Sequence, residues 1–100
     1  MATPEGAVKD KVRKVLKEYG VYWFMPVQAG FGAPGLDFHC SYNGLAMFIE
    51  TKAGNKKPTP RQETTIENIE KSGGKVFVIN EVTGTEKLEA WLKEIGDEKG

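Results

Sequence analysis

Residues 35–52 read GLDFHCSYNGLAMFIETK, and this stretch decides the fold. The Asn43-Gly44 pair at its centre is a strong short-range signal for a two-residue type I′ turn, so an antiparallel strand is expected on each side of it. Counting outward from this turn places Asp37 opposite Glu50. Directly opposed like charges destabilise an antiparallel pair, so the hairpin carries two carboxylates at a cost in stability.

The two faces of this hairpin differ in chemistry, because side chains alternate along a strand. An apolar core face is expected from Leu36, Phe38, Cys40, Tyr42, Leu45, Met47 and Ile49. The other face carries Asp37, Glu50 and Lys52. A solvated outer face with a weak surface ion pair would explain these charges. Ala46 and Phe48 on the same face instead indicate that the charged residues are partly covered.

A partly buried pair of carboxylates favours a bound cation. Mg²⁺ takes oxygen ligands from one or two carboxylates together with water and substrate phosphate. A lysine beside such a site can position or deprotonate the attacking water, or stabilise the charge that develops on phosphorus. The pattern therefore points to hydrolysis of a phosphodiester bond.

Upstream of the hairpin, the sequence predicts a helix over residues 4–19, capped by Thr3-Pro4 and followed by Gly20. The aromatic stretch VYWFMPV, residues 21–27, predicts a strand that Pro26 places at a sheet edge. The glycine-rich loop QAGFGAPG, residues 28–35, lacks the lysine of a phosphate-binding loop and precedes a strand.

Downstream, Thr59-Pro60 with Gln62 forms a capping box that begins a second helix, which ends at Gly73-Gly74. Its buried stripe is expected to contain Ile66 and Ile69. The stretch KVFVIN, residues 75–80, predicts a strand of the buried kind. A last helix, capped by Thr83 or Thr85 and ended by Gly96, would bury one face that carries Leu88, Trp91, Leu92 and Ile95. The order is α-β-β-β-α-β with an added C-terminal helix, an α/β fold around a mixed sheet.

Composition limits the function classes. The chain has 100 residues, enough for one small domain, with 39% hydrophobic and 28% charged residues and no apolar run of membrane-spanning length. A single cysteine, Cys40, excludes an internal disulfide and a cysteine zinc site, and the N-terminus has no apolar signal segment, so an intracellular location, cytoplasmic or nucleoid-associated, is expected. The formal net charge is zero, but basic residues gather in the first helix and over residues 52–61. They form either a working face or ordinary solvated surface.

The combination of Gly35-Leu36-Asp37 with Glu50-Thr51-Lys52 in this element order resembles the PD-(D/E)XK nuclease superfamily. The stretches GFGAPGLDF, FIETKAG, PTPRQ and SGGKVFVI are similar to the small stand-alone VRR-NUC domains, the viral type included. The resemblance covers nearly the whole chain and implies a restriction-endonuclease-like fold for a single nuclease domain over residues 1–100. Leu36 replaces the proline that is usual before the first aspartate; that proline shapes the backbone and contributes no chemistry.

The resemblance also implies roles for individual residues. Asp37, Glu50 and the backbone carbonyl of Thr51 would bind Mg²⁺ or Mn²⁺, and Lys52 would be the catalytic lysine. Gln62 would contact DNA or orient the site, a role compatible with its capping box. The helix-one acid of many members would be Glu5, with Asp10 as the second candidate, although stabilisation of the helix N-terminus also explains Glu5.

The implied partner is DNA, and the implied activity is that of an endonuclease. Phosphate contacts are expected from Lys9, Arg13, Lys56, Lys57 and Arg61. A homodimer acting on a four-way (Holliday) junction is the preferred hypothesis. The alternatives are a nicking or flap nuclease of the same fold and a non-catalytic DNA-binding or assembly module.

Two further groups have both a structural and a functional interpretation. His39 shares the strand face of Asp37 and is interpreted as a surface residue rather than a base. The aromatic residues Tyr22, Trp23 and Phe24 could stack on unpaired bases, but packing in the core is the favoured interpretation.

Overall fold

The protein is described by a computed structural model that covers residues 3–26 and 35–99. Most of the predicted glycine-rich loop lies outside these residues. The elements are α1 (Pro4–Glu18), β1 (Tyr22–Phe24), β2 (Phe38–Tyr42), β3 (Leu45–Thr51), α2 (Pro60–Lys71), β4 (Lys75–Ile79) and α3 (Glu86–Lys99). This order confirms the predicted α/β arrangement.

The described strands form a mixed four-stranded sheet in the order β1-β2-β3-β4. The pairs β1·β2 and β2·β3 are antiparallel, whereas β4 runs parallel to β3. Positive φ angles of 50° at Asn43 and 81° at Gly44 are those a type I′ turn requires. The predicted register is confirmed from Tyr42 opposite Leu45 to Phe38 opposite Ile49. The ladder ends there, one pair before Asp37 and Glu50.

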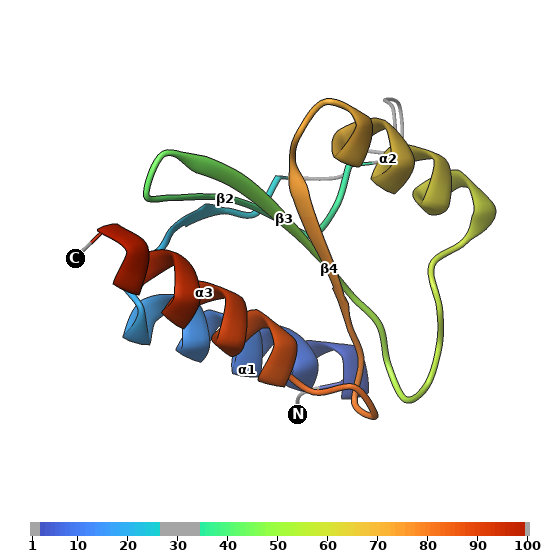
Figure 1. Ribbon diagram of the computed structural model, residues 1–100. Coiled ribbons are helices and arrows are strands. Elements are labelled where there is room, and N and C mark those ends of the chain that lie inside the picture. The colour runs from blue at the N-terminus through green and yellow to red at the C-terminus, as the bar shows by residue number, and fades with distance from the viewer. Residues whose placement is uncertain (1–2, 27–34, 100) are drawn as a thin grey trace.

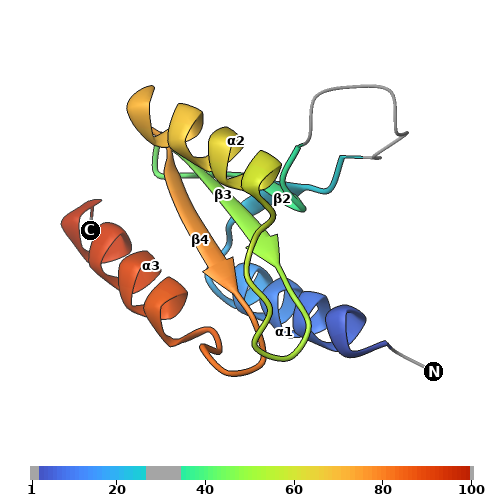
Figure 2. The same cartoon turned by 90° about the vertical axis from the view of Figure 1, so that its right-hand side faces the viewer.

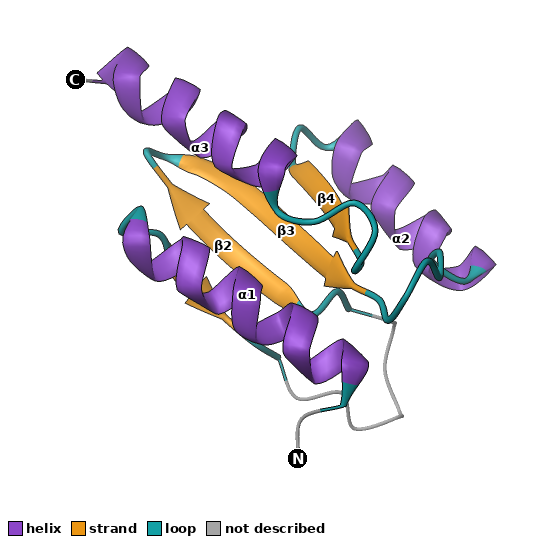
Figure 3. Ribbon diagram, turned by 90° about the horizontal axis from the view of Figure 1, so that it is seen from below, coloured by secondary structure: helices purple, strands orange, loops and turns teal. Residues whose placement is uncertain are grey.

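The described elements form three layers, with the sheet in the middle. Helices α1 and α3 lie on one face, and α2 lies on the other (Figures 1 and 3). The core fills the space between the sheet and the α1–α3 layer, with its largest fully buried side chains at Phe38, Leu16, Leu36, Met47, Ile49, Leu88 and Leu92. The hairpin face predicted to be apolar is therefore the core face, except that Leu45, beside the turn, is 43% exposed.

The face that carries α2 is covered less completely than the sequence predicts. Ile66 and Ile69 are only partly buried, and none of the residues of α2, all within the described part, is buried. Among the described helices it is the one on this side of the sheet, and it packs mainly on β4 (Figure 2). Strand β4 itself is an edge of the described sheet, so Val76, Phe77 and Val78 keep some exposure and the prediction of a buried strand is wrong.

The C-terminal helix continues past the glycine that was predicted to end it. Helix α3 includes Gly96, where an added Cβ would lie 2.7 Å from the Tyr42 hydroxyl oxygen. The side-chain amide of Asn43 donates a hydrogen bond to the Ile95 carbonyl at 3.0 Å. Gly96 therefore serves a close approach between helix and hairpin rather than helix termination.

The helix caps follow the sequence. The Thr3 hydroxyl accepts a hydrogen bond from the Gly6 amide, and the Thr59–Gln62 capping box is complete. Thr85 directly precedes α3, and its carbonyl accepts from the Glu89 amide. No helix in residues 3–26 or 35–99 combines the length and the apolar character needed to span a membrane.

Candidate active site

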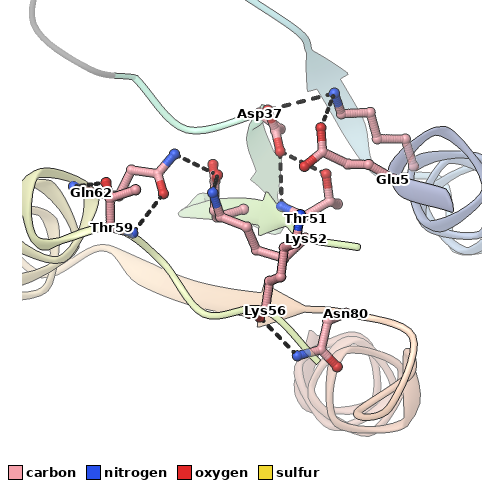
Figure 4. A network of polar contacts seen from close by, with 10 residues as sticks. Glu5, Asp37, Thr51, Lys52, Lys56, Thr59, Gln62 and Asn80 are labelled. Atoms are coloured by element: carbon pink, nitrogen blue, oxygen red, sulfur yellow. Dashed lines mark hydrogen bonds and ion pairs between the residues drawn. The ribbon is translucent and has the colours of Figure 1, made fainter. Parts of the chain in front are cut away.

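The two predicted acids, Asp37 and Glu50, meet where β3 ends; Figure 4 shows Asp37 beside Thr51 there. Glu50 and Thr51 are the last residues of β3, and both are buried. Asp37 lies in the bend before β2, and its Oδ2 accepts hydrogen bonds from the Thr51 amide at 2.8 Å and the Thr51 hydroxyl at 2.6 Å. These bonds orient the Asp37 carboxylate at the end of the sheet, next to Glu50.

The Glu50 carboxylate has one oxygen in use and one without a partner. Its Oε2 accepts a hydrogen bond from Gln62 Nε2 at 2.8 Å and lies 3.4 Å from Lys52 Nζ. Its Oε1 is buried and has no hydrogen-bond partner among the described residues. A buried oxygen of this kind costs free energy unless a cation or another donor reaches it.

The protonation of Glu50 reflects this environment. Burial, and then the nearby charge of Asp37, raise the pKa of Glu50 from 4.5 to about 7, while Lys52 acts in the opposite direction. Desolvation thus outweighs the lysine. At neutral pH the carboxyl group sits near its titration midpoint, so a bound divalent cation would strongly favour the charged form.

Lys52 is held in place at both ends. Its backbone amide donates a hydrogen bond to the Ile79 carbonyl at 2.9 Å, just beyond the β3·β4 ladder. Its side chain is 14% exposed and reaches back to Glu50. The structure therefore brings Asp37, Glu50, Thr51, Lys52 and Gln62 together at one end of the sheet.

Helix α1 contributes Glu5 and Lys9 near the same end of the sheet. Lys9 Nζ lies 3.5 Å from Glu5 Oε2 and 3.9 Å from Asp37 Oδ1, so it connects the helix-one acid to the aspartate. Asp10 instead forms an ion pair with Arg13 and is 65% exposed. Of the two helix-one candidates, Glu5 is the one directed toward the site, with the Lys9 ammonium next to it.

The donor set fits a hard divalent cation. Asp37 and Glu50 supply carboxylate oxygens, and Glu50 Oε1 has no partner among residues 3–26 and 35–99. Mg²⁺ and Mn²⁺ need only one or two such groups when water and phosphate complete the shell. Within residues 3–26 and 35–99, no three His, Cys, Asp or Glu side chains gather closely enough to hold a metal by themselves. Glu5 is therefore outside the immediate pair.

The predicted phosphate contacts fall on two elements. Lys56, Lys57 and Arg61 are exposed between β3 and the first turn of α2, whereas Lys9 and Arg13 belong to α1. Lys9 faces the acids, and Arg13 Nη2 lies 3.5 Å from the Met25 sulfur.

Asn80 is a site-supporting residue that the sequence analysis missed. It is buried directly after β4, and its Nδ2 donates a hydrogen bond to the Lys56 carbonyl at 3.1 Å (Figure 4). Its Oδ1 accepts from the amides of Val82 and Thr83. An Asn after an apolar strand and before a turn is the signal that could have found it, because Asn side chains mimic a backbone turn.

The remaining candidates have structural roles. The His39 ring packs edge-to-face on Phe48, with 5.1 Å between ring centroids. Cys40 is buried in the core, and burial raises the pKa of its thiol to about 12, which makes it a poor nucleophile.

The chain matches no protein-family model and no curated protein. Among solved structures it matches a chain described as "VRR_NUC domain", with a TM-score of 0.73 and 24% sequence identity, over 92% of this chain and 97% of that one. The chain has the VRR_NUC fold. The fold that the sequence resemblance implies is thereby confirmed, because the match runs over nearly the full length of both chains.

In this VRR_NUC fold, Gln62 links the start of α2 to the acid pair. Its Oε1 accepts from the Thr59 amide at 3.0 Å while its Nε2 donates to Glu50. We expect Gln62→Met to lower the free energy of unfolding by about 1–2 kcal/mol and to raise the pKa of Glu50 further, because both bonds are lost. Urea denaturation and NMR titration of the Glu50 carboxyl carbon would measure the two effects.

The matched control for this prediction is Thr59→Ala. It removes the hydroxyl that accepts from the Gln62 amide at 3.2 Å and leaves the Gln62–Glu50 bond in place. It should cost about 1 kcal/mol of stability and leave the Glu50 titration where it is. If both variants moved that titration equally, Gln62 would act only as a cap.

Proposed function

We propose that residues 1–100 form a single nuclease domain, a metal-dependent endodeoxyribonuclease that hydrolyses phosphodiester bonds in branched DNA. The observation that supports it best is the buried Glu50 carboxylate: one oxygen has no hydrogen-bond partner in the described part of the chain, and Lys52 lies 3.4 Å from the other. The VRR_NUC fold and the name of the matched structure support the same class of activity.

Asp37 and Glu50 would hold Mg²⁺ or Mn²⁺, with the Thr51 carbonyl as a further oxygen ligand. When bound, such an ion supplies a Lewis acid and lowers the pKa of water. The protein orients these ligands: Thr51 fixes Asp37 with two hydrogen bonds, and Gln62 fixes Glu50 with one. Fixing the ligands before substrate arrives lowers the reorganisation needed in the transition state.

Lys52 would act on the reacting phosphate. Its amine is partly buried against Glu50, where water screens its charge less than at the surface. From that position it can orient the attacking water and stabilise the negative charge on the phosphoryl oxygens. Glu5, reached through Lys9, would tune the charge at the same end.

DNA would approach along five cations, of which Lys56, Lys57 and Arg61 are exposed and Lys9 and Arg13 are partly buried. Lys56, Lys57 and Arg61 lie on the segment that follows Lys52, and Lys9 and Arg13 lie on α1. Contacts of this type fix the register of the phosphodiester backbone without reading its sequence, and they weaken steeply with salt.

The preferred substrate is a four-way junction cut by a homodimer, because a two-fold axis would relate two active sites to two strands. The expected location is intracellular, in the cytoplasm or at the nucleoid. The test is cleavage of end-labelled four-way junction, flap and plain duplex with Mg²⁺, Mn²⁺ or EDTA, with the oligomeric state measured by light scattering.

The three outcomes of that test separate the hypotheses. Paired symmetric cuts in the junction that disappear with EDTA would support the resolvase. Metal-dependent cutting confined to flaps or nicked duplex would keep the nuclease and reject the junction. A folded protein that binds DNA and cuts none of these substrates would be a binding or assembly module.

A further inference from the structure

Two aromatic side chains of β1 are exposed where the sequence analysis favoured core packing. Tyr22 is 69% exposed and Phe24 is 54% exposed, whereas Trp23 between them is partly buried against the core. The reason is alternation: with Trp23 directed toward the α1–α3 layer, its two neighbours must point to the opposite face of the sheet. The core-packing interpretation is wrong for Tyr22 and Phe24.

The strand register places these rings on the sheet face that also carries Glu50. Phe24 pairs with His39, which pairs with Phe48, and Phe48 lies two residues before Glu50 on β3. From strand geometry, the Phe24 backbone is roughly 10 Å across the sheet and roughly 7 Å along it from that of Glu50. If a DNA strand places a phosphate at Asp37 and Glu50, the base of a neighbouring nucleotide can therefore reach these rings.

This part of the face is uncovered in the described structure. Helix α2 packs mainly on β4, at the other side of the sheet (Figure 2). Beside Tyr22 and Phe24, Ser41 and Ala46 are exposed as well. Together these four residues form what we call the open face. Tyr22 and Phe24 place two large aromatic rings on it, and contiguous exposed apolar surface of this kind is where interaction sites are found.

Chemistry and position together favour nucleic-acid bases as the occupant. The apolar groups are aromatic rings, which stack on the π-face of any base. Ala46 of the open face and Glu50 lie on the same face of β3, with the partly buried Phe48 between them. Aromatic rings close to a phosphate-binding site are an arrangement that holds single-stranded nucleic acid.

We infer that Tyr22 and Phe24 stack on unpaired bases next to the scissile phosphate and so make the enzyme select DNA with single-stranded or unstacked nucleotides. This inference rests on the proposed nuclease function and names the feature of the substrate that the site reads. In a continuous duplex the bases remain stacked on one another, so the rings find no partner.

The test is equilibrium binding, measured by fluorescence anisotropy in the Lys52→Ala background. The probes are a duplex with a short single-stranded flap, the same duplex with abasic residues in the flap, and a blunt duplex. Tyr22→Leu and Phe24→Leu keep apolar bulk and lose the ring. Each is expected to weaken flap binding about tenfold and to leave the abasic and blunt probes within about twofold, since one stacked base contributes about 1–3 kcal/mol.

The control is Val82→Ala, because Val82 is 75% exposed and follows β4 rather than β1. It should leave binding of every probe unchanged. Unchanged flap binding in both leucine variants would overturn the inference, as would an equal loss on the blunt duplex. So would loss of a dimer in these variants with flap affinity intact, which would assign the open face to a second copy of the chain.

Failure of the inference is distinguishable from failure of the proposed function. The nuclease proposal fails if wild-type protein cuts no DNA in Mg²⁺ or Mn²⁺, whatever the leucine variants do. If wild type cuts DNA and Tyr22→Leu and Phe24→Leu bind all three probes as tightly as before, the nuclease stands and the stacking surface is rejected.

Discussion

Replacing Lys52 with alanine is expected to lower the rate of DNA cleavage by at least about 100-fold, because one preorganised group at the developing charge contributes about that much or more. The Lys52 amine lies 3.4 Å from Glu50 Oε2, and the Lys52 backbone amide donates a hydrogen bond to the Ile79 carbonyl. Because these contacts fix the position of Lys52, a neighbouring lysine cannot replace it. Single-turnover cleavage at saturating enzyme would measure the chemical step separately from binding.

Two companion variants sharpen the Lys52 prediction. Lys56→Ala removes an exposed lysine from the same segment and should weaken binding only modestly while the single-turnover rate is kept. Lys52→Arg keeps the positive charge but cannot give up its proton. Substantial activity in Lys52→Arg would assign the lysine to charge stabilisation, and loss would assign it to proton transfer. Lys52→Ala cutting within about fivefold of wild type would remove Lys52 from the mechanism.

Glu50→Gln is expected to stabilise the metal-free protein at alkaline pH and to abolish its stabilisation by Mn²⁺. The pKa of Glu50 rises from 4.5 to about 7 on folding, a shift that corresponds to roughly 3 kcal/mol. Since the folded-state pKa is the higher one, the native state binds the extra proton between these values. Stability from this group is therefore greatest below pH 4.5 and falls as pH rises toward about 7.

The direction of this pH dependence determines the pH values at which the two proteins are compared. Urea denaturation in EDTA should show Glu50→Gln more stable than wild type by up to about 3 kcal/mol near pH 8, with the difference shrinking near pH 5. Mn²⁺ should raise the stability of wild type at pH 8 and not that of the variant. Glu67→Gln, at an exposed position of α2, is the control and should follow wild type.

A Glu50→Gln protein that is less stable than wild type near pH 8 without metal would contradict this account. It would mean that the attraction between Glu50 and Lys52 exceeds the cost of burial and of the Asp37 charge. The carboxylate would then be a structural ion-pair partner first.

The parts of the fold and site that sequence predicts are those that local rules determine. The Asn43-Gly44 turn sets the hairpin register on its own, because only positive φ angles close a type I′ turn. The Thr59–Gln62 capping box likewise needs only four consecutive residues. Counting outward from the turn was sufficient to predict that Asp37, Glu50 and Lys52 share one strand face, and the resemblance added the role of Gln62 at the site.

The parts that sequence misses depend on packing between distant segments. Residues 75–80, KVFVIN, form a central strand only if a further strand pairs with them. Their own sequence does not indicate whether such a strand exists. The exposure of Tyr22 and Phe24 follows from where α2 lies, since the same alternating pattern would be buried under a helix placed over β1. The β2·β3 ladder ends at the Phe38–Ile49 pair, and beyond it the Asp37 side chain accepts a hydrogen bond from the Thr51 amide. Counting residues outward from the turn does not show where the ladder ends.

The buried amide of Asn80 affects how tightly DNA can be held. It bonds the Lys56 carbonyl, and nearby the Glu81 side chain accepts from the Gly54 amide while the Glu81 amide donates to the Gly54 carbonyl. The segment between β3 and α2, which carries Lys56 and Lys57, is thus hydrogen-bonded to the residues that follow β4 before any ligand binds. A fastened backbone loses little conformational entropy on association, so more of the phosphate attraction remains as net affinity.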